Sequence, residues 1–220
     1  MKKSIAIVSG GLDSVTLAYH LRDAGYRLHL LTFDYGQRHK KEVSFAQLCA
    51  NRLGAQHDII DIATVGQLLR GSALTDANVT VPDGDYAQNN MSVTVVPNRN
   101  AIMLAIGFSI AAAEDADNVA IGVHGGDHFI YPDCRPEFLE RFDFMEKASL
   151  GEYASVKLYA PFVRLGKNEI VKIGTTLGVP FAETWSCYKG DACHCGTCST
   201  CVERKQAFAQ AGVMDPTIYT

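Results

Sequence analysis

The sequence predicts an α/β protein built on a parallel, doubly wound sheet, with a small cysteine-rich segment near its C-terminal end. Three observations lead to this prediction. Apolar runs alternate with stretches of helical periodicity along most of the 220 residues, which is typical of βαβ crossovers and so of a parallel sheet. A glycine-rich turn follows the first apolar run, and five of the seven cysteines fall between positions 187 and 201.

The first part of the chain predicts three strands that alternate with two helices. The first strand is predominantly apolar, as expected for a strand covered on both faces. The two helices end at Gly25 and Gly54, which is the usual C-terminal signal of a helix. The expected order is strand 3–8, helix 13–24, strand 27–33, helix 41–53 and strand 57–62.

The alternation resumes after a long interruption. Between residues 66 and 96, Gly, Asn, Asp and Pro are frequent and no periodicity holds, which predicts an irregular excursion of the kind that often covers an active site. Apolar spacing then predicts helix 100–113, strand 118–123, helix 136–150 with Phe138, Leu139, Phe142 and Met145 facing inward, and helix 167–177. Because ligands of a parallel sheet bind at the carboxyl ends of its strands, the segments that follow strands are site candidates.

The composition favours a small-molecule substrate. Hydrophobic residues make up 47% and charged residues 20% of the chain, so a packed core is expected. The net charge of −4 argues against salt-driven binding of nucleic acid. No apolar run approaches the ~20 residues that span a bilayer, and the N-terminal apolar run is too short for a signal peptide. We therefore expect a cytoplasmic protein without a membrane partner.

The hexapeptide SGGLDS, which follows the first strand, predicts a phosphate-binding turn. Its glycines let backbone N–H groups approach a ligand, and the next helix adds its N-terminal dipole. Ser9 and Ser14 supply hydroxyl donors, whereas Asp13 suits either a bridging magnesium ion or a helix cap. A Walker loop is excluded, because the one Gly-Lys pair in the chain lacks the Ser or Thr that must follow it.

The cysteine cluster CYKGDACHCGTCSTC predicts a structural zinc site. Zn²⁺ takes four ligands in a tetrahedron, and the spacing proposes Cys187, Cys195, Cys198 and Cys201. Cys193 and His194 stay open as substitutes for one ligand, and a redox-active pair or an iron–sulfur cluster stays open as an alternative. The cluster divides the chain into a nucleotide-binding domain over residues 1–180 and a helical, zinc-binding segment over residues 181–220.

The motifs together resemble one family. SGGLDS is similar to the loop of the N-type ATP pyrophosphatases, which have the PP-loop, adenine-nucleotide α-hydrolase-like fold. The stretches FDYGQRH, VPNRN and YPDCRPEF, combined with the cysteine cluster, resemble the 7-cyano-7-deazaguanine synthase family of queuosine and archaeosine precursor biosynthesis. The resemblance runs from about Ile5 to about Arg204. It departs from the family pattern around Asp127, where the aspartate is kept but its neighbours differ.

The resemblance implies an ATP-dependent ligase that forms C–N bonds. ATP adenylates 7-carboxy-7-deazaguanine, ammonia displaces AMP to give the amide, and a second adenylation leads to the nitrile. The implied cofactors are ATP, Mg²⁺ and one structural Zn²⁺ per chain, and the implied assembly is a homodimer. No glutaminase segment is visible, so free ammonia is the implied nitrogen donor.

The resemblance also implies roles for individual residues. The implied catalytic residues are Asp13, Ser14, Arg99 and Lys167, with Arg99 neutralising phosphate charge. The implied nucleotide contacts are Val8, Ser9, Gly10, Gly11, Leu12, Asp13, Ser14 and Phe33. The implied substrate contacts are Asp34, Arg38, His39, Asp127, Tyr131, Asp133 and Arg135. Structural interpretations stay open beside these roles: Phe33 suits a core, and Lys167 suits an exposed helix start.

Three other functions stay open on the sequence alone. The first is a tRNA-thiolating enzyme of the same superfamily, although the net charge and the lack of an RNA-binding module speak against it. The second is a non-catalytic nucleotide-binding relative. The third is a relative that joins the deazaguanine acid to a protein amine instead of ammonia.

Overall fold

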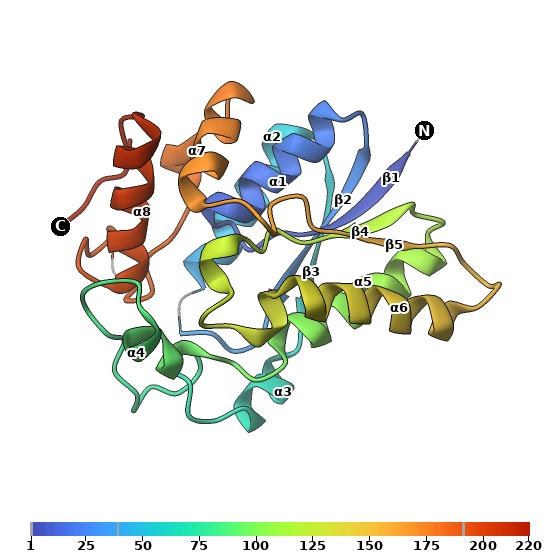
Figure 1. Cartoon of the computed structure of the whole chain (residues 1–220), viewed down its shortest axis with the longest axis horizontal. Coiled ribbons are helices and arrows are strands. Elements are labelled where there is room, and N and C mark those ends of the chain that lie inside the picture. Colours follow the sequence, from blue (N-terminus) through green and yellow to red (C-terminus); the bar gives the residue numbers. More distant parts are fainter. Residues whose placement is uncertain (1, 39, 191) are drawn as a thin grey trace.

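A parallel sheet lies at the centre of the computed structural model, which describes residues 2–38, 40–190 and 192–220. The sheet has the strand order β3-β2-β1-β4-β5, and every neighbouring pair is parallel. The strands are β1 (Lys3–Ile7), β2 (Arg27–Asp34), β3 (Gln56–Asp61), β4 (Asn118–Ala120) and β5 (Lys157–Tyr159). The predicted doubly wound sheet is thus confirmed, and helices cover both of its faces (Figure 1).

The helices form two layers, one on each face. One layer holds α1 (Leu12–Asp23), α2 (Lys41–Leu53), α7 (Lys167–Thr176) and α8 (Ser199–Ala211), and the other holds α5 (Arg99–Ala113) and α6 (Pro136–Leu150). The shorter helices are α3 (Ala63–Leu68), α4 (Gln88–Met91) and the 3-10 turns Ser92–Thr94, Gly125–Asp127, Pro132–Cys134 and Phe181–Glu183. None of the helices among these described residues has the length and apolar character needed to cross a membrane.

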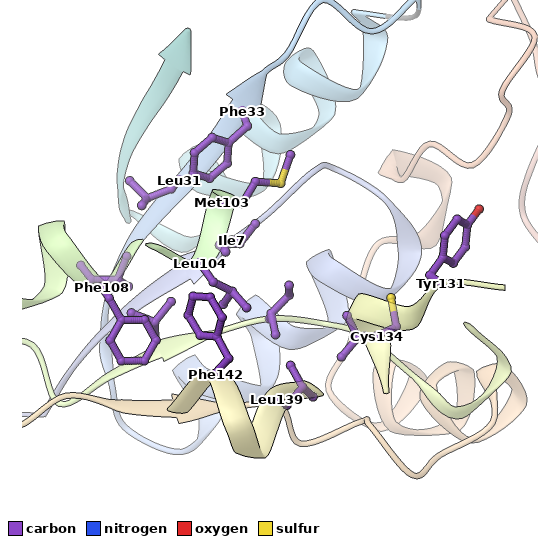
Figure 2. Close-up of a cluster of buried hydrophobic side chains, with 14 of the residues drawn as sticks. Ile7, Leu31, Phe33, Met103, Leu104, Phe108, Tyr131, Cys134, Leu139 and Phe142 are labelled. Atoms are coloured by element: carbon purple, nitrogen blue, oxygen red, sulfur yellow. The ribbon is translucent and has the colours of Figure 1, made fainter. Parts of the chain in front are cut away.

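The core under α5 and α6 fixes the orientation of α5. Leu104 and Phe108 of α5 are fully buried, and the ring of Phe108 lies 6.0 Å from that of Phe142 on α6 (Figure 2). Burying a side chain of this size contributes about 1.5–3 kcal/mol. The apolar face of α5 therefore holds the helix against the sheet and brings its first residues to the carboxyl edge.

One predicted core position is wrong. Met145 was expected to face inward, but it is 49% exposed, whereas Glu146 is only 7% exposed. The inner face of α6 runs through Leu139, Phe142 and position 146, in steps of three and four residues. The next inward position therefore falls on a glutamate, and burial raises the pKa of that carboxyl.

The chain reverses its direction across the sheet between β1 and β4. β2 and β3 extend the sheet on one side of β1, and β4 and β5 extend it on the other. In such folds the crevice at this switch point is the usual ligand site. The predicted strand over residues 118–123 ends at Ala120, and the residues after it turn into this crevice. β5 was not predicted, because three residues carry too little pattern.

The excursion and the cysteine-rich segment meet over the same edge of the sheet. The excursion lies below α8 in Figure 1, and Asp83 forms a bridge with Cys198. In addition, Phe208 of α8 is 1% exposed within the core of α1 and α7, and the buried Arg204 donates to the hydroxyl of Thr184 (2.8 Å). The segment after residue 180 thus packs against the sheet domain, and its status as a separate unit stays a prediction.

Candidate active site

A pocket opens at the carboxyl edge of the sheet, where β1 and β4 part. Its walls come from the loops after β1, β2 and β4, from the first residues of α5 and α7, from the excursion and from the cysteine-rich segment. The pocket brings together these residues predicted from the sequence: Val8, Ser9, Gly11, Asp13, Ser14, Phe33, Arg38, Arg99, Asp127, Tyr131 and Lys167. Gly10, Leu12, Asp34, Asp133 and Arg135 lie outside its lining, and His39 lies outside the described residues.

The SGGLDS turn has the geometry of an anion cradle. Gly11 precedes α1 and provides no side-chain cap, so the first N–H groups of the helix are left without one. The hydroxyl oxygens of Ser9 and Ser14 lie 3.2 Å apart, and the backbone N–H of Ser9 donates to Ser14 Oγ (3.2 Å). Two hydroxyl groups and a helix N-terminus therefore face the same part of the pocket.

Gly10 and Leu12 shape this turn from behind. Gly10 has φ of +85°, and a Cβ atom there would lie 2.3 Å from the carbonyl oxygen of Glu42. Only glycine therefore permits both this backbone conformation and the close approach of α2. Leu12 is 2% exposed and belongs to the core.

Lys167 is partly buried and lies among carboxylates at the phosphate-loop end of the pocket. Its Nζ lies 3.4 Å from Asp13 Oδ2 and 2.5 Å from Oε2 of Glu203 on α8. Burial by itself lowers the pKa of Lys167, but the carboxylates of Asp13, Glu203 and Asp127 outweigh it and raise the pKa above its usual value. The side chain is only 16% exposed, so the alternative of a solvated helix-start lysine does not hold. Lys167 is a permanent cation at this end.

His124 and Tyr86 complete the same cluster. The backbone N–H of Gly126 donates to His124 Nδ1 (3.0 Å), so the other ring nitrogen of the neutral histidine carries the hydrogen. That nitrogen, Nε2, faces Oδ2 of Asp127 at 3.5 Å and Oδ2 of Asp13 at 3.8 Å. Tyr86 of the excursion donates its hydroxyl hydrogen to Asp127 Oδ1 (2.8 Å). Both oxygens of Asp127 thus have partners or near neighbours.

The donor set around Asp13 fits a magnesium ion. Oδ1 of Asp13 is buried and has no hydrogen-bond partner among the described residues, although buried polar atoms nearly always have one. Carboxylate oxygens together with phosphate oxygens are the ligands that Mg²⁺ prefers. Asp13 borders the phosphate turn and therefore can supply such a ligand.

The opposite end of the pocket contains two charged residues and several tyrosines. Arg99 donates to the hydroxyl of Tyr35 (3.3 Å), and its guanidinium lies 5.7 Å from the centre of that ring. Glu42, from the first turn of α2, lines the same end together with Tyr188 and Tyr131. Burial raises the pKa of Glu42 to about 7, and the charge of Arg99 opposes the rise.

Phe33 and Arg38 line the pocket but also have structural partners. Phe33 is 4% exposed and belongs to the core around α5. Arg38 donates to the backbone carbonyl oxygens of Val79 (2.9 Å) and Ala73 (3.4 Å). Arg38 therefore ties the excursion to the loop after β2, and its predicted substrate contact is not tested by this arrangement.

The three acidic or basic residues outside the lining are engaged in local structure. Asp34 accepts from Lys40 Nζ (2.7 Å). Asp133 accepts from the backbone N–H of Asn100 (3.0 Å) and so caps the start of α5. Arg135 donates to a backbone carbonyl oxygen of the preceding loop (2.8 Å). Their roles in substrate binding stay predictions.

The cysteine cluster has the geometry of a four-thiolate metal site. The Sγ atoms of Cys187, Cys195, Cys198 and Cys201 all lie within 4.8 Å of one another, and two of the pairs are 4.0 Å apart. A zinc ion with Zn–S bonds of about 2.3 Å places its sulfurs about 3.8 Å apart. Backbone N–H groups at 195 and 198 donate to sulfurs of the cluster (3.4 and 3.3 Å), which stabilises the thiolates.

Neither of the substitute ligands considered from the sequence is needed. His194 Nε2 accepts from the backbone N–H of Ser186 (3.0 Å), so it is turned to the backbone, and Cys193 is not part of the cluster. Cys187 also lines the pocket. A metal held here would therefore support one wall of the site.

Sequence reasoning missed several residues of the site. Tyr86, Tyr188 and Glu42 line the pocket, and Glu203 lies behind Lys167. His124 lies in a segment that follows a strand and that the sequence marks as a site candidate, but it is not among the predicted site residues. Glu203 and Tyr86 carry no such signal, because only tertiary packing brings α8 and the excursion to this edge.

The chain matches known proteins over nearly its whole length. The family model described as queuosine biosynthesis protein QueC matches residues 3–212. The 7-cyano-7-deazaguanine synthases of Rhizobium etli and Rhizobium rhizogenes are each 61% identical over 217 residues, which cover 99% of this chain and 92% of each relative. The synthase of Brucella ovis has the same identity, with 93% of its length covered.

Solved structures share the fold at much lower identity. A predicted subunit of tRNA methyltransferase from Methanocaldococcus jannaschii aligns with a TM-score of 0.52 and 16% identity, over 80% of this chain and 75% of that one. An NMN synthetase from Francisella tularensis aligns with a TM-score of 0.50 and 15% identity, over 97% and 78%. These likenesses bear on the fold alone.

Proposed function

The chain belongs to the queuosine biosynthesis protein QueC family, and on this premise we propose that its pocket converts 7-carboxy-7-deazaguanine and ammonia to 7-cyano-7-deazaguanine at the expense of ATP. The chain is an enzyme of this family, whose relatives at 61% identity carry the name of that synthase. The family membership speaks against tRNA thiolation and against a non-catalytic nucleotide-binding role.

The phosphate-loop end is suited to the leaving group. We propose that the β- and γ-phosphates of ATP lie on the SGGLDS turn, where the hydroxyls of Ser9 and Ser14 and the start of α1 supply donors. A carboxylate oxygen of the substrate attacks the α-phosphorus, the bond from that phosphorus to the bridging oxygen breaks, and pyrophosphate leaves. Lys167 neutralises the charge that builds up on the phosphate oxygens at this end, and Arg99 would do so from the opposite end of the pocket.

Asp13 is the residue that would hold a magnesium ion. Its buried Oδ1, which lacks a partner among the described residues, is the observation that supports this role. The ion would supply charge neutralisation between the carboxylate and the polyphosphate. Oδ2 of the same carboxylate lies 3.4 Å from Lys167 Nζ and 3.8 Å from His124 Nε2.

The later steps require no second pocket. Ammonia adds to the activated carbonyl carbon, the C–O bond to AMP breaks and a proton is lost, which leaves the amide. The amide oxygen then attacks the α-phosphorus of a second ATP and releases pyrophosphate. Loss of AMP and of both protons on nitrogen gives the nitrile. Each activation uses the same cradle, so one turn serves both.

The cysteine cluster and the assembly complete the proposal. We propose one Zn²⁺ per chain on Cys187, Cys195, Cys198 and Cys201, with no open position, as a structural ion. The family resemblance supports a homodimer, and the seven free thiols suit a reducing compartment such as the cytoplasm. The boundary near residue 180 between a nucleotide-binding domain and a zinc-binding segment belongs to the same proposal.

One observation carries the proposal: the uncapped start of α1, the partly buried cation Lys167 and the Asp13 oxygen that lacks a partner among the described residues all border one pocket in a chain of this family. The test is mass analysis of the product formed from 7-carboxy-7-deazaguanine, ¹⁵N-ammonia and MgATP, with AMP quantified. The expected result is a labelled nitrile and two AMP for each molecule formed.

Other products would contradict the proposal. ADP with orthophosphate would exclude transfer to the α-phosphorus. A deazaguanine adduct on a protein amine, with no free nitrile, would favour the relative that uses a protein acceptor. The variant D13N tests the role of Asp13 directly, because it keeps the size of the side chain but should lose turnover.

A further inference from the structure

The two ends of the pocket differ in how their charges are satisfied. At the phosphate-loop end, Lys167 contacts both Asp13 and Glu203. At the other end, Glu42 and Arg99 line the same pocket, yet no ion pair joins either of them to another residue in the described part of the chain. The electrostatic influence of Arg99 still reaches the carboxyl of Glu42. Two opposite charges thus face one half-buried space without closing on each other.

The position of Glu42 is fixed by its backbone. The residue lies in the first turn of α2, and α2 packs so closely on the phosphate turn that Gly10 has no room for a Cβ atom beside the Glu42 carbonyl oxygen. The carboxylate of Glu42 accepts no hydrogen bond from any described residue. A half-buried carboxylate without donors is costly, and a ligand that brings donors removes the cost.

The other carboxylates of the pocket are already engaged. Asp127, predicted from the sequence to hold the ring, accepts from Tyr86 and lies beside His124. Asp13 faces Lys167 and the phosphate turn. Among the carboxylates that line the pocket in the described ranges, Glu42 is the one with neither oxygen in a hydrogen bond or ion pair, whereas Asp13 has one unpartnered oxygen, Oδ1, beside the phosphate turn.

The surroundings of Glu42 suit a flat ring. Tyr35, Tyr131 and Tyr188 line the same end, and the first two are each 7% exposed, so their positions are set by packing. Aromatic side chains favour stacked or edge contacts with a planar heterocycle. A carboxylate at the margin of such a slot can accept two parallel hydrogen bonds from adjacent N–H groups.

We propose that Glu42 is a specificity-determining residue, whose carboxylate accepts hydrogen bonds from the ring N–H and the exocyclic amino group of the deazaguanine. This inference rests on the proposed function, because it takes the substrate from there. It predicts that the enzyme distinguishes an aminopyrimidinone ring from the same ring without its amino group, and that this distinction depends on Glu42.

The test measures binding by calorimetry, without ATP, for two ligands. These are 7-carboxy-7-deazaguanine and its analogue that lacks the exocyclic amino group. The wild-type protein should prefer the amino-bearing acid by about 10- to 100-fold, as expected for a hydrogen bond to a charged group. The variant E42Q should lose most of that preference, because the NH2 group of its amide would face an N–H group of the ligand and cannot accept a hydrogen bond from it.

Two further variants separate recognition from folding. E146Q makes the same chemical change at a buried glutamate of α6 outside the pocket lining, and it should keep the full preference. E42D keeps the charge but withdraws it by one methylene, so it should bind more weakly while still preferring the amino-bearing acid. Should E42Q fail to fold, E42D carries the test.

The outcomes distinguish this inference from the proposed function. If the wild-type protein prefers the amino-bearing acid and E42Q keeps that preference, or E42D binds this acid as tightly as the wild type does, the inference is wrong and the proposed function stands. If D127N abolishes the preference instead, Asp127 is the residue that accepts the hydrogen bonds of the ring. If the wild-type protein binds neither acid, the proposed function fails, and the inference fails with it.

Discussion

The phosphate-loop end and the ring end of the pocket are built on opposite principles. At the first, a cation lies between two carboxylates before any ligand arrives, so the charges are arranged in advance and little reorganisation is needed during the reaction. At the second, which is the end lined by Glu42, Arg99 and the tyrosines, Glu42 and Arg99 form no ion pair within the described structure. From this difference we infer that the charged groups at the first end are prearranged for the leaving group, whereas those at the second end become paired only when the substrate binds.

The largest expected effect comes from disrupting the cysteine-rich segment, which forms a wall of the pocket. The backbone N–H of Trp185 donates to the Gly10 carbonyl oxygen (2.9 Å), and Cys187 lines the pocket. The variant C198S, or chelation of the metal, should lower the melting temperature strongly and abolish turnover, because metal binding and folding are coupled. Thermal unfolding with metal analysis checks this.

A serine at Cys49 is the matched control for that experiment. Cys49 is buried in α2, outside the metal cluster, so C49S should cost only the stability expected of a buried thiol and keep one zinc per chain. Equal melting temperatures for wild type and C198S would contradict a structural role for the metal.

The second-largest effect is expected from a substitution at the phosphate-loop end alone. K167M keeps the length of the side chain but removes its charge, and it leaves Asp13 and Glu203 uncompensated. Turnover should fall by about 10²- to 10³-fold, as for loss of one group that stabilises transition-state charge, while binding of the deazaguanine acid stays within a few-fold. Steady-state kinetics and calorimetry measure the two.

The exposed Lys172 of the same helix offers the control K172M, which should behave as wild type. A loss of ring binding in K167M as large as the loss of turnover would mean that the two ends do not work separately.

The third effect is the pH dependence of the affinity for the deazaguanine acid. Burial raises the pKa of Glu42 to about 7, and Arg99, Tyr35 and Tyr188 are the groups that face it. Affinity for the deazaguanine acid should therefore rise about tenfold between pH 6 and pH 8, as the carboxylate forms. Calorimetry across this range checks it, and a slope that persists in E42Q would assign the titration to another group.

The stability of the ligand-free protein should change with pH in the opposite direction to the affinity. A carboxyl whose pKa is higher in the folded state binds its proton more tightly there, so its contribution to stability falls as the pH rises from about 4.5 through 7. Saturating ligand should reduce this slope, because the ionised form then has donors. Denaturant unfolding at several pH values provides the measurement.

The smallest effect concerns the link between the excursion and the phosphate-loop end. Y86F removes one hydrogen bond to Asp127 and keeps the ring, so it should lower kcat about three- to tenfold, in line with about 0.5–1.5 kcal/mol for such a bond. KM for the acid should change little. A rise in KM without any change in kcat would place Tyr86 at the ring end instead.

Local rules made much of this protein predictable. The SGGLDS turn, the glycine helix ends and the spacing of Cys187, Cys195, Cys198 and Cys201 each depend on neighbours in the chain, because backbone sterics and ligand reach act over a few residues. Helix 136–150 follows from apolar periodicity and has the predicted bounds. Even so, the inward position fell on Glu146 instead of Met145, since phase along a helix is set by what it packs against.

The sequence by itself determined the kind of sheet, the SGGLDS turn before α1 and the four cysteines that cluster. Only the tertiary structure decided that Lys167 lies between Asp13 and Glu203, and that Glu42 and Arg99 line one pocket with no ion pair between them in the described ranges. The physical reason is that these juxtapositions arise from helices packed across one sheet edge. Their residues are far apart in the chain, and no local preference encodes which of them will meet.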